Sequence, residues 1–215
     1  MALALFDLDN TLLNGDSDHS WGCYLADIGA VDAELHKAKQ DFFYQQYLAG
    51  ELDIYEFCEF QFFVLTQYSL EQLYTWRAHF LETVVEPMIV NGKTDLLKRH
   101  REAGDDVLII TATNDFVTAP IAKRLGVETL LATEAEFVDG AYTGKLRGTP
   151  CYQAGKVTRL MQWLDQQGKK FENSYFYSDS INDLPLLELV DTAIAVTPDD
   201  RLRNHALKSN WRIID

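Results

Sequence analysis

The sequence has few of the features that mark secreted, disulfide-rich or membrane-spanning proteins. Its 215 residues include only 3 cysteines, at positions 23, 58 and 151, with no C-x-x-C pair and no metal-ligand spacing. No apolar stretch reaches the roughly 18 residues of a membrane helix, and no basic and then apolar segment opens the chain. We therefore expect reduced thiols, a cytoplasmic location and no membrane partner.

Basic residues are also scarce. The chain has 19 lysines and arginines against 33 aspartates and glutamates, and its formal net charge is −14. Such a charge disfavours binding to nucleic acids and anionic membranes, so neither is an expected partner. Hydrophobic residues make up 47% of the chain, which is ordinary for a globular protein and sufficient for one large domain or a domain with an insertion.

The first eleven residues combine an apolar run with two carboxylates. Residues 2–6 predict a strand that is buried on both faces, and Asp7 and Asp9 follow it closely. If the backbone stays extended, the two carboxylates point to the same side and repel each other by about 4 kcal/mol at an effective dielectric of about 20. A divalent cation, or a proton on one carboxyl group, would offset that repulsion. The pair therefore suits chemistry that needs a carboxylate nucleophile beside a carboxylic acid.

A helical segment follows this strand. From residue 16 to residue 87, apolar residues recur at helical spacing and no convincing strand occurs. Ser69 and Gln72 fit a capping box before the last predicted helix, residues 70–85, and Gly29 and Gly50 stand where helices end. Residues 16–90 hold 13 acidic but only 3 basic residues. We expect an acidic helical domain inserted into the fold.

Strands and helices alternate after residue 90. Strands are expected at 107–110, 129–132, 174–177, 193–196 and 211–214, with helices at 93–103, 116–125, 156–167 and 199–209 and an Asp-Gly hairpin at 137–142. Repeated β-α-β units predict an α/β fold whose parallel sheet is covered by helices and binds ligands at the carboxyl ends of its strands. The expected domains are a core, residues 1–15 and 88–215, and an α-helical cap, residues 16–87.

Polar residues follow three of the expected strands. They are Asp7-x-Asp9-x-Thr11 after the first strand, Thr111 after residues 107–110, and Asp179-x-x-Asn182-Asp183 after residues 174–177. A parallel sheet brings all three segments to one edge. Together with Lys156 they supply metal-binding carboxylates, a nucleophile, a hydroxyl group and a cation. Phosphoryl transfer needs this set of groups.

In these motifs the chain resembles the haloacid dehalogenase superfamily of phosphatases, and most closely its phosphoserine-phosphatase-like subgroup. The matching segments are Phe6-Asp7-Leu8-Asp9-Asn10-Thr11, Ile109-Ile110-Thr111, Gly155-Lys156 and Ser178-Asp179-Ser180-Ile181-Asn182-Asp183. Their order and spacing match as well, and the resemblance covers essentially the whole chain. It implies a Rossmann-like core with the helical insertion as a cap. Dehalogenating members lack the second aspartate, so Asp9 favours a phosphate ester over a carbon–halogen substrate.

The resemblance also implies a role for each carboxylate. Asp7 is expected to attack phosphorus and form an aspartyl-phosphate, and Asp9 to protonate the leaving alcohol and then activate water. Mg²⁺ is the expected cofactor, bound by Asp7, the backbone carbonyl of Asp9 and Asp179. Asp183 is expected to support this site by orienting a metal-bound water or Lys156.

Further residues are expected to contact the substrate. Thr111 and Lys156 would hold the phosphoryl oxygens as part of the catalytic set, and Thr11, Ala112 and Asn182 complete the contacts expected on the core side. The substrate itself is expected to be a small phosphorylated metabolite, because a cap over the site excludes water and large ligands.

The cap departs from the phosphoserine phosphatase pattern. Those enzymes carry a glutamate nine residues after the nucleophile, where this chain has Asp16, and a cap arginine for the serine carboxylate, where alignment places Glu59. An acidic cap disfavours a substrate carboxylate and favours an amine or imidazolium, as in histidinol phosphate or an amino-alcohol phosphate. Aromatic cap residues that could stack on such a group are Trp21, Tyr44, Tyr47, Phe57 and Phe60.

Two other functions fit the same sequence. A phosphomutase or phosphotransferase would use a sugar hydroxyl group in place of the attacking water. A phosphate-sensing or partner-binding protein would use the scaffold without catalysis, although the intact Asp7, Asp9, Lys156 and Asp179 argue against this. The sequence leaves the oligomeric state open.

Overall fold

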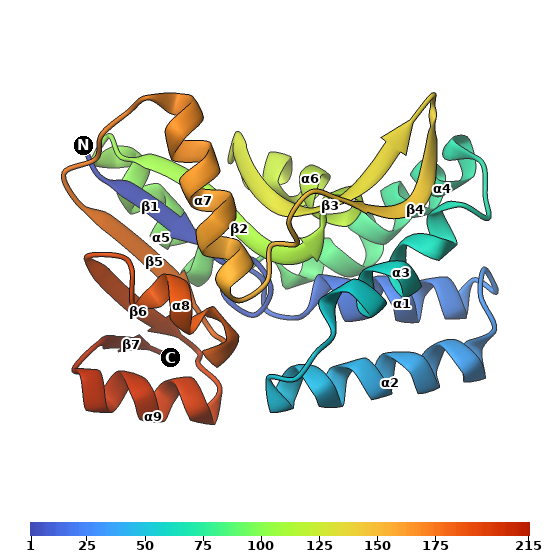
Figure 1. Ribbon diagram of the computed structural model, residues 1–215, viewed down its shortest axis with the longest axis horizontal. Helices are drawn as coiled ribbons and strands as arrows, with labels where there is room; N and C mark the ends of the chain where they lie inside the picture. The colour runs from blue at the N-terminus through green and yellow to red at the C-terminus, as the bar shows by residue number, and fades with distance from the viewer.

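The computed structural model describes residues 1–215 and contains one seven-stranded sheet (Figure 1). The strand order is β4-β3-β2-β1-β5-β6-β7. The short first strand, β1 (Leu3–Phe6), lies at the centre and pairs in parallel with β2 (Asp106–Asn114) and β5 (Ser174–Ser178). Only the pair β3–β4 is antiparallel. The predicted α/β fold with a parallel sheet is confirmed.

The remaining elements of the core alternate along the chain. The strands are β3 (Thr129–Val138), β4 (Ala141–Arg147), β6 (Thr192–Val196) and β7 (Arg212–Ile214). The helices are α5 (Asn91–Glu102), α6 (Asp115–Arg124), α7 (Ala154–Gln167), α8 (Leu184–Leu187) and α9 (Asp200–Ser209). A single 3₁₀ turn, Ile181–Asp183, precedes α8.

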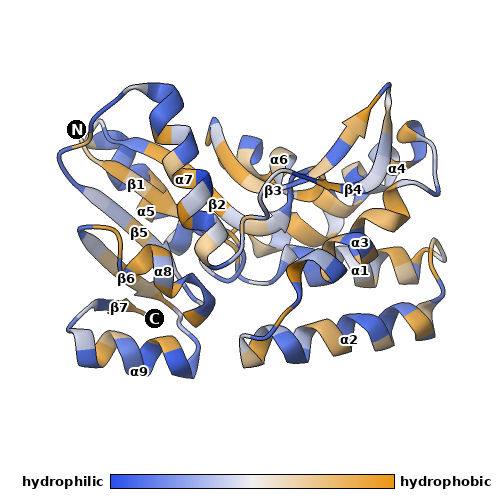
Figure 2. Cartoon of the chain, viewed as in Figure 1, coloured by the Kyte–Doolittle hydropathy of each residue, from blue (hydrophilic) through white to orange (hydrophobic).

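The central strand is buried on both faces, as its unbroken apolar run predicts. Successive side chains of a strand point to opposite faces, so Leu3 and Leu5 pack with α7, α8 and α9, whereas Ala4 and Phe6 pack with α5 and α6. The apolar cluster that contains Ala4 and Phe6 continues into the cap. Figure 2 shows how hydrophilic residues line the outer helices α2 and α9 while the central strands are largely apolar.

The cap consists of four helices between β1 and α5. They are α1 (Ser17–Asp27), α2 (Ala33–Ala49), α3 (Ile54–Leu65) and α4 (Leu70–Phe80). Each begins at a residue whose side chain accepts a backbone N–H of the first turn, and Ser69 accepts from Gln72 as the capping box predicts. Gly50 ends α2 with a left-handed φ of 77°.

The two connections between cap and core lie side by side. Leu13 and Ile89 form an isolated antiparallel bridge, and the Asn14 N–H donates to the Met88 carbonyl at 2.8 Å. The helix predicted for residues 70–85 is shorter than expected, because α4 gives way to a π-helical turn, Leu81–Val85, and a 3₁₀ turn, Glu86–Met88. Pro87 has no N–H to donate, so a regular helix cannot continue past this point.

A long hairpin joins the core to the cap. The strand expected at 129–132 extends to Val138, turns at Asp139-Gly140 and returns as β4, which lies along α3 (Figure 1). Both turn residues have positive φ, 49° and 83°, which explains why the Asp-Gly pair predicts the turn. Only the length of β3 differs from the prediction.

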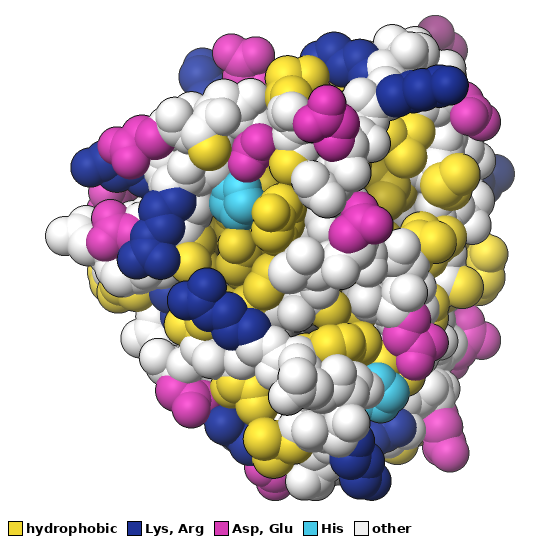
Figure 3. All heavy atoms as spheres, turned by 90° about the vertical axis from the view of Figure 1, so that its left-hand side faces the viewer, with side chains coloured by type: hydrophobic (Ala, Val, Ile, Leu, Met, Phe, Trp, Pro, Cys, Tyr) yellow, Lys and Arg dark blue, Asp and Glu magenta, His cyan; other side chains and the backbone are white.

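Charge is distributed unevenly over the molecule. On the face of the core that lies away from the cap, basic and acidic side chains are intermixed (Figure 3). The acidic excess lies mainly in residues 16–90, with 13 acidic residues against 3 basic ones. None of the helices combines the length and the apolar character needed to cross a bilayer.

We predict that Gly144→Ala destabilises the hairpin's contact with the cap. Gly144 has a φ of 79°, and a Cβ atom there would lie 3.0 Å from the Thr66 side-chain methyl group of the cap. Gly140 has a similar φ of 83° but open space around it. Both alanine variants should lose about 1 kcal/mol of unfolding free energy from backbone strain, and Gly144→Ala should lose more.

Urea denaturation of the two variants measures this difference. Thr66→Ser removes the methyl group but keeps the hydroxyl that donates to Phe63, so it should recover part of the Gly144→Ala loss. Equal losses for Gly140→Ala and Gly144→Ala, with no recovery by Thr66→Ser, would show that the hairpin does not press on the cap.

Candidate active site

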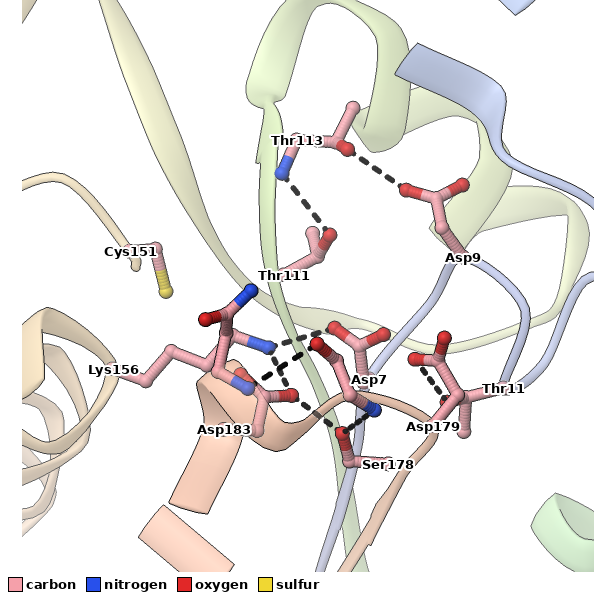
Figure 4. Close-up of polar contacts among 12 residues, drawn as sticks. Asp7, Asp9, Thr11, Thr111, Thr113, Cys151, Lys156, Ser178, Asp179 and Asp183 are labelled. Carbon is pink, nitrogen blue, oxygen red and sulfur yellow. Dashed lines mark hydrogen bonds and ion pairs between the residues drawn. The ribbon is translucent and has the colours of Figure 1, made fainter. Parts of the chain in front are cut away.

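Three strand ends meet at one edge of the sheet. β1 is flanked by β2 and β5, so the loop after Phe6 lies between Thr111 of β2 and Asp179 at the end of β5. Figure 4 shows Asp7, Thr111, Lys156 and Asp183 converging there. The parallel register thus assembles side chains that are more than 100 positions apart in sequence.

Lys156 forms the centre of the buried charge network. Its ammonium group donates to Asp7 Oδ1 and to Asp183 Oδ2, at 2.7 Å each, and lies 5.6 Å from the Phe176 ring centroid. Ser178 Oγ donates to the same Asp183 oxygen at 2.7 Å. Only 1% of Lys156 is exposed. Removing one partner from such a buried pair typically costs about 3–5 kcal/mol, so Lys156 stabilises both carboxylates and offsets their mutual repulsion.

Asp7 has one oxygen paired and one available. Lys156 occupies Oδ1, and no protein group donates to Oδ2. Burial raises the pKa of Asp7 to about 7, with Asp183 and Asp9 adding to the rise and Lys156 opposing it. A carboxylate that is desolvated, held by an ammonium group on one side and open on the other can act as a nucleophile.

Asp9 points away from Asp7 and toward the cap (Figure 4). Its Oδ1 accepts from the Ser17 N–H at 2.6 Å, and its Oδ2 accepts from Thr113 Oγ1 at 2.8 Å. Burial, followed by the neighbouring charge of Asp16, raises the pKa of Asp9 to about 6. A carboxyl group whose pKa lies near neutrality can both give and accept a proton, as a general acid and base must.

The residues expected to contact the substrate on the core side lie in different settings. Thr111, Ala112 and Asn182 line the cavity above the sheet edge. Thr11 does not line it, because its side chain is fully buried and its hydroxyl group donates to Asp179 at 3.4 Å. Thr11 therefore supports Asp179 from below, and this differs from the contact with substrate that the sequence suggested.

The donor set around Asp7 and Asp179 is suited to a hard divalent cation. Asp7 has an open carboxylate oxygen, and Asp179 receives only the long hydrogen bond from Thr11. Burial and the charges of Asp7 and Asp183 raise the pKa of Asp179 well above its usual range, which marks uncompensated negative charge. No three acidic, histidine or cysteine side chains form a metal cluster, and the side chain of Asp9 is directed elsewhere. Two carboxylates and the Asp9 carbonyl are therefore the available ligands, all of them oxygens, as Mg²⁺ prefers.

A cavity of about 440 Å³ lies between this edge of the sheet and the cap. Its wall contains seven carboxylates, Asp7, Asp9, Asp16, Asp18, Asp179, Asp183 and Asp199, but Lys156 is its only lysine or arginine. Tyr44, Tyr47 and Phe57 of the aromatic set also line it, whereas Trp21 and Phe60 do not. Trp21 packs edge-on against Phe80, and Phe60 lies against His36, so both belong to the packing of the cap.

Glu59, the cap residue expected to contact the substrate, lies outside the cavity wall. Glu59 is exposed on α3 and does not line the cavity, whereas Phe57 and Gln61 of the same helix do. Residues two positions apart on a helix point about 200° away from each other, so an alignment error of one or two residues reverses the direction of a side chain.

No pattern in the sequence marks Asp18, Gln61 or Thr113 as lining the cavity. Asp18 lies in the first turn of α1, where an acidic residue is ordinary because it favours the helix dipole. Gln61 lies on a helix rich in aromatic residues, and Thr113 follows Thr111 at the end of β2. Only the folded arrangement brings them to the cavity.

The end of α2 is bound to the core beside the cavity. Asn182 donates to the Tyr47 carbonyl at 3.0 Å, Gln153 to the Gly50 carbonyl at 3.3 Å, and Arg201 to the Leu48 carbonyl at 3.1 Å. These carbonyls belong to the last turn of α2 and to Gly50 after it, where few donors from the helix itself remain. The core thus satisfies the end of a cap helix, and this contact closes one side of the cavity.

Sequence comparison relates the chain to known phosphatases. A family model described as haloacid dehalogenase-like hydrolase matches residues 4–188. A histidinol-phosphatase of Neisseria meningitidis is 42% identical over 99% of this chain and 98% of its own length. A phosphoserine phosphatase of Mycobacterium tuberculosis is 34% identical over 100% of this chain and 70% of its own length.

Two solved structures share the whole architecture. A protein of unknown function from Bordetella pertussis Tohama I matches with a TM-score of 0.94 and 44% identity, over 100% of this chain and 98% of that one. A substrate-bound phosphoserine phosphatase matches with a TM-score of 0.71 and 17% identity, over 99% of this chain and 91% of that one. The second match concerns the fold alone.

We predict that the protein, kept in excess chelator, becomes less stable as the pH rises from 5 to 8. The pKa values of Asp7, Asp9 and Asp179 are raised in the folded state, so folding favours their protonated forms. The stability that this gives is present at low pH and is lost as the pH rises through about 6 and 7. Thermal unfolding at each pH measures it.

The Asp179→Asn variant isolates the effect. It removes an uncompensated charge, so at pH 8 without divalent cations it should be more stable than the natural protein, and Mg²⁺ should stabilise it less. The matched control is Asp191→Asn, because Asp191 is exposed and hydrogen bonds from Ser174 lower its pKa; this variant should gain nothing. A loss of stability in Asp179→Asn at pH 8 would contradict the assigned charge balance.

Proposed function

Since the chain belongs to the haloacid dehalogenase-like hydrolases and is a phosphatase of that family, we propose that it hydrolyses a small phosphomonoester through an aspartyl-phosphate on Asp7. The observation that supports this most directly is the pairing of Asp7 with Lys156. One oxygen of Asp7 is held at 2.7 Å from the ammonium group, which leaves the other free to attack. The fully buried Thr111 hydroxyl group and Lys156 flank the same point.

In the first step the free oxygen of Asp7 attacks phosphorus. A bond forms between Asp7 and phosphorus, the bond from phosphorus to the ester oxygen breaks, and Asp9 transfers its proton to that departing oxygen. Lys156 and Thr111 hold the phosphoryl oxygens in place. A pKa near 6 supports this role, because Asp9 retains a proton in a fraction of molecules near neutral pH.

In the second step water takes the place of the alcohol. Asp9, now deprotonated, removes a proton from the water, whose oxygen attacks phosphorus and releases Asp7 with inorganic phosphate. Ser17 and Thr113 hold the Asp9 carboxyl group toward the cavity in both steps. Asp7, Asp179 and the Asp9 carbonyl would hold Mg²⁺, which supplies positive charge for the phosphoryl oxygens.

The proposed substrate carries an amine on its leaving group. Asp16 lines the cavity near Asp9, and its side chain accepts from backbone N–H groups, that of His19 at 2.9 Å, but pairs with no lysine or arginine. A substrate carboxylate would meet only more negative charge there. This supports an amino-alcohol phosphate, such as histidinol phosphate, and agrees with the name of the relative that is 42% identical.

We predict that Asp7→Asn abolishes turnover without unfolding the protein, and that Asp9→Asn has a selective effect. Asp9→Asn should impair hydrolysis of alkyl phosphates far more than hydrolysis of p-nitrophenyl phosphate, because a nitrophenolate leaves without a proton. Steady-state rates on both esters measure the difference, with circular dichroism as the control for folding. Equal losses on both esters would argue against the acid role of Asp9.

We also predict a preference for an amine on the leaving group. One favourable charge pair corresponds to about 1.5–3 kcal/mol, so kcat/KM should be about 10- to 100-fold higher for an amino-alcohol phosphate than for the matched alcohol phosphate. Adding a carboxylate, as in phosphoserine, should lower it. A higher kcat/KM for phosphoserine than for the amino-alcohol phosphate would overturn this choice of substrate but leave the phosphatase mechanism intact.

A further inference from the structure

Asp18 places a second acidic side chain in the cavity wall next to Asp16. Its Oδ2 accepts from Gln61 Nε2 at 2.8 Å, and its Oδ1 is 3.4 Å from Asn114 Nδ2. The two amides come from α3 and from the end of β2, and both residues are buried. The direction of this carboxylate on α1 is therefore fixed by two other elements, α3 and β2.

The charge of Asp18 is oriented but not balanced. Both of its partners are neutral amides, and Lys156, the only lysine or arginine in the cavity wall, is engaged by Asp7 and Asp183. Burial, together with the charges of Asp16 and Asp9, raises the pKa of Asp18 well above its usual range. An N–H donor from a ligand would relieve this imbalance.

Aromatic side chains lie in the same wall. Tyr44 of α2 and Phe57 of α3 line the cavity together with Asp18, and Phe43 packs behind Phe57. Flat apolar surfaces in the same cavity as an oriented carboxylate suit a ligand that is itself flat and carries an N–H at its edge. An aliphatic amine alone would use the carboxylate but not these rings.

We propose that Asp18 is a specificity-determining residue that accepts a hydrogen bond from a heteroaromatic ring N–H of the leaving group, while Asp16 binds the amine. Gln61 and Asn114 act as positioning residues for it. The inference rests on the proposed function and narrows it. Among amino-alcohol phosphates it selects those that carry both an amine and a nitrogen ring, as histidinol phosphate does.

Two esters that differ only in the ring test this assignment. Phenylalaninol phosphate keeps the amine and an aromatic ring of similar size but has no ring nitrogen, so it cannot donate to Asp18. We expect the natural enzyme to prefer histidinol phosphate over phenylalaninol phosphate in kcat/KM. In Asp18→Asn this preference should fall by about 10- to 100-fold, the range expected for a hydrogen bond to a charged group. For each variant, kcat/KM on these esters is divided by kcat/KM on p-nitrophenyl phosphate, which corrects for a general loss of activity.

Three further variants separate binding from structure. Asp16→Asn should lower kcat/KM for both esters alike, because both carry the amine, and should leave their ratio unchanged. Gln61→Met should lower the same ratio as Asp18→Asn but by less, mainly through a higher KM for histidinol phosphate. The matched control is Asp27→Asn, an exposed acidic residue of the same helix outside the cavity wall, which should change neither the rates nor the ratio.

Each remaining outcome has one meaning. If Asp18→Asn lowers kcat/KM by the same factor for histidinol phosphate, phenylalaninol phosphate and p-nitrophenyl phosphate, Asp18 only links α1, α3 and β2 structurally. The inference is then wrong. If the natural enzyme prefers amino-alcohol phosphates but treats the histidinol and phenylalaninol esters alike, the inference fails and the proposed function stands. If it shows no preference for the amine at all, the proposed substrate class fails.

Discussion

Repulsion among carboxylates governs this end of the molecule. Seven aspartates face one cavity, and the single lysine in its wall is bound between two of them, Asp7 and Asp183, at 2.7 Å from each. The charges that remain can be balanced by protons, by a metal ion beside Asp179 or by a positively charged ligand beside Asp16. Each proposal made above uses one of these ways to balance the negative charge. The mechanism uses the proton on Asp9, the metal site uses a cation beside Asp179, and the substrate preference uses an amine beside Asp16.

The sequence could predict the core of the site but not its cap side. Asp7 and Asp9 follow a buried strand, and parallel pairing brings Thr111 and Asp179 to the same edge, so the positions of the core residues follow from topology. The direction of a helical side chain depends on rotation about the helix axis, and an apolar pattern as broad as that of α3 leaves this rotation undefined. The sequence therefore does not show that Gln61 rather than Glu59 lines the cavity.

The ends of helices and strands could be predicted only where a particular residue type determines them. The Asp-Gly turn and the helix ends at Ser69 and Gly50 were predictable, because each needs a particular residue type. The length of β3 and the π-helical turn at Leu81–Val85 were not, because they follow from pairing with β4, which packs along α3, and from the cap junction. The contacts of Gln153 and Asn182 with the end of α2 likewise join the cap to the loops that carry Lys156 and Asp183.

The position of β1 in the sheet has a consequence for how the chain folds. Its hydrogen-bonding partners begin at Asp106 and Ser174, so the strand that carries Asp7 can pair on one edge only after β2 has been synthesised and on the other edge only after β5 has been synthesised. Part of the cap can form before that, because α1 packs against α2, but α3 also packs along β4 and needs it. Such non-local pairing slows folding and prolongs exposure of an apolar strand edge. Assembly of the nucleophile is therefore among the last events in folding, and a chain interrupted before β5 would hold a nearly complete cap without a working site.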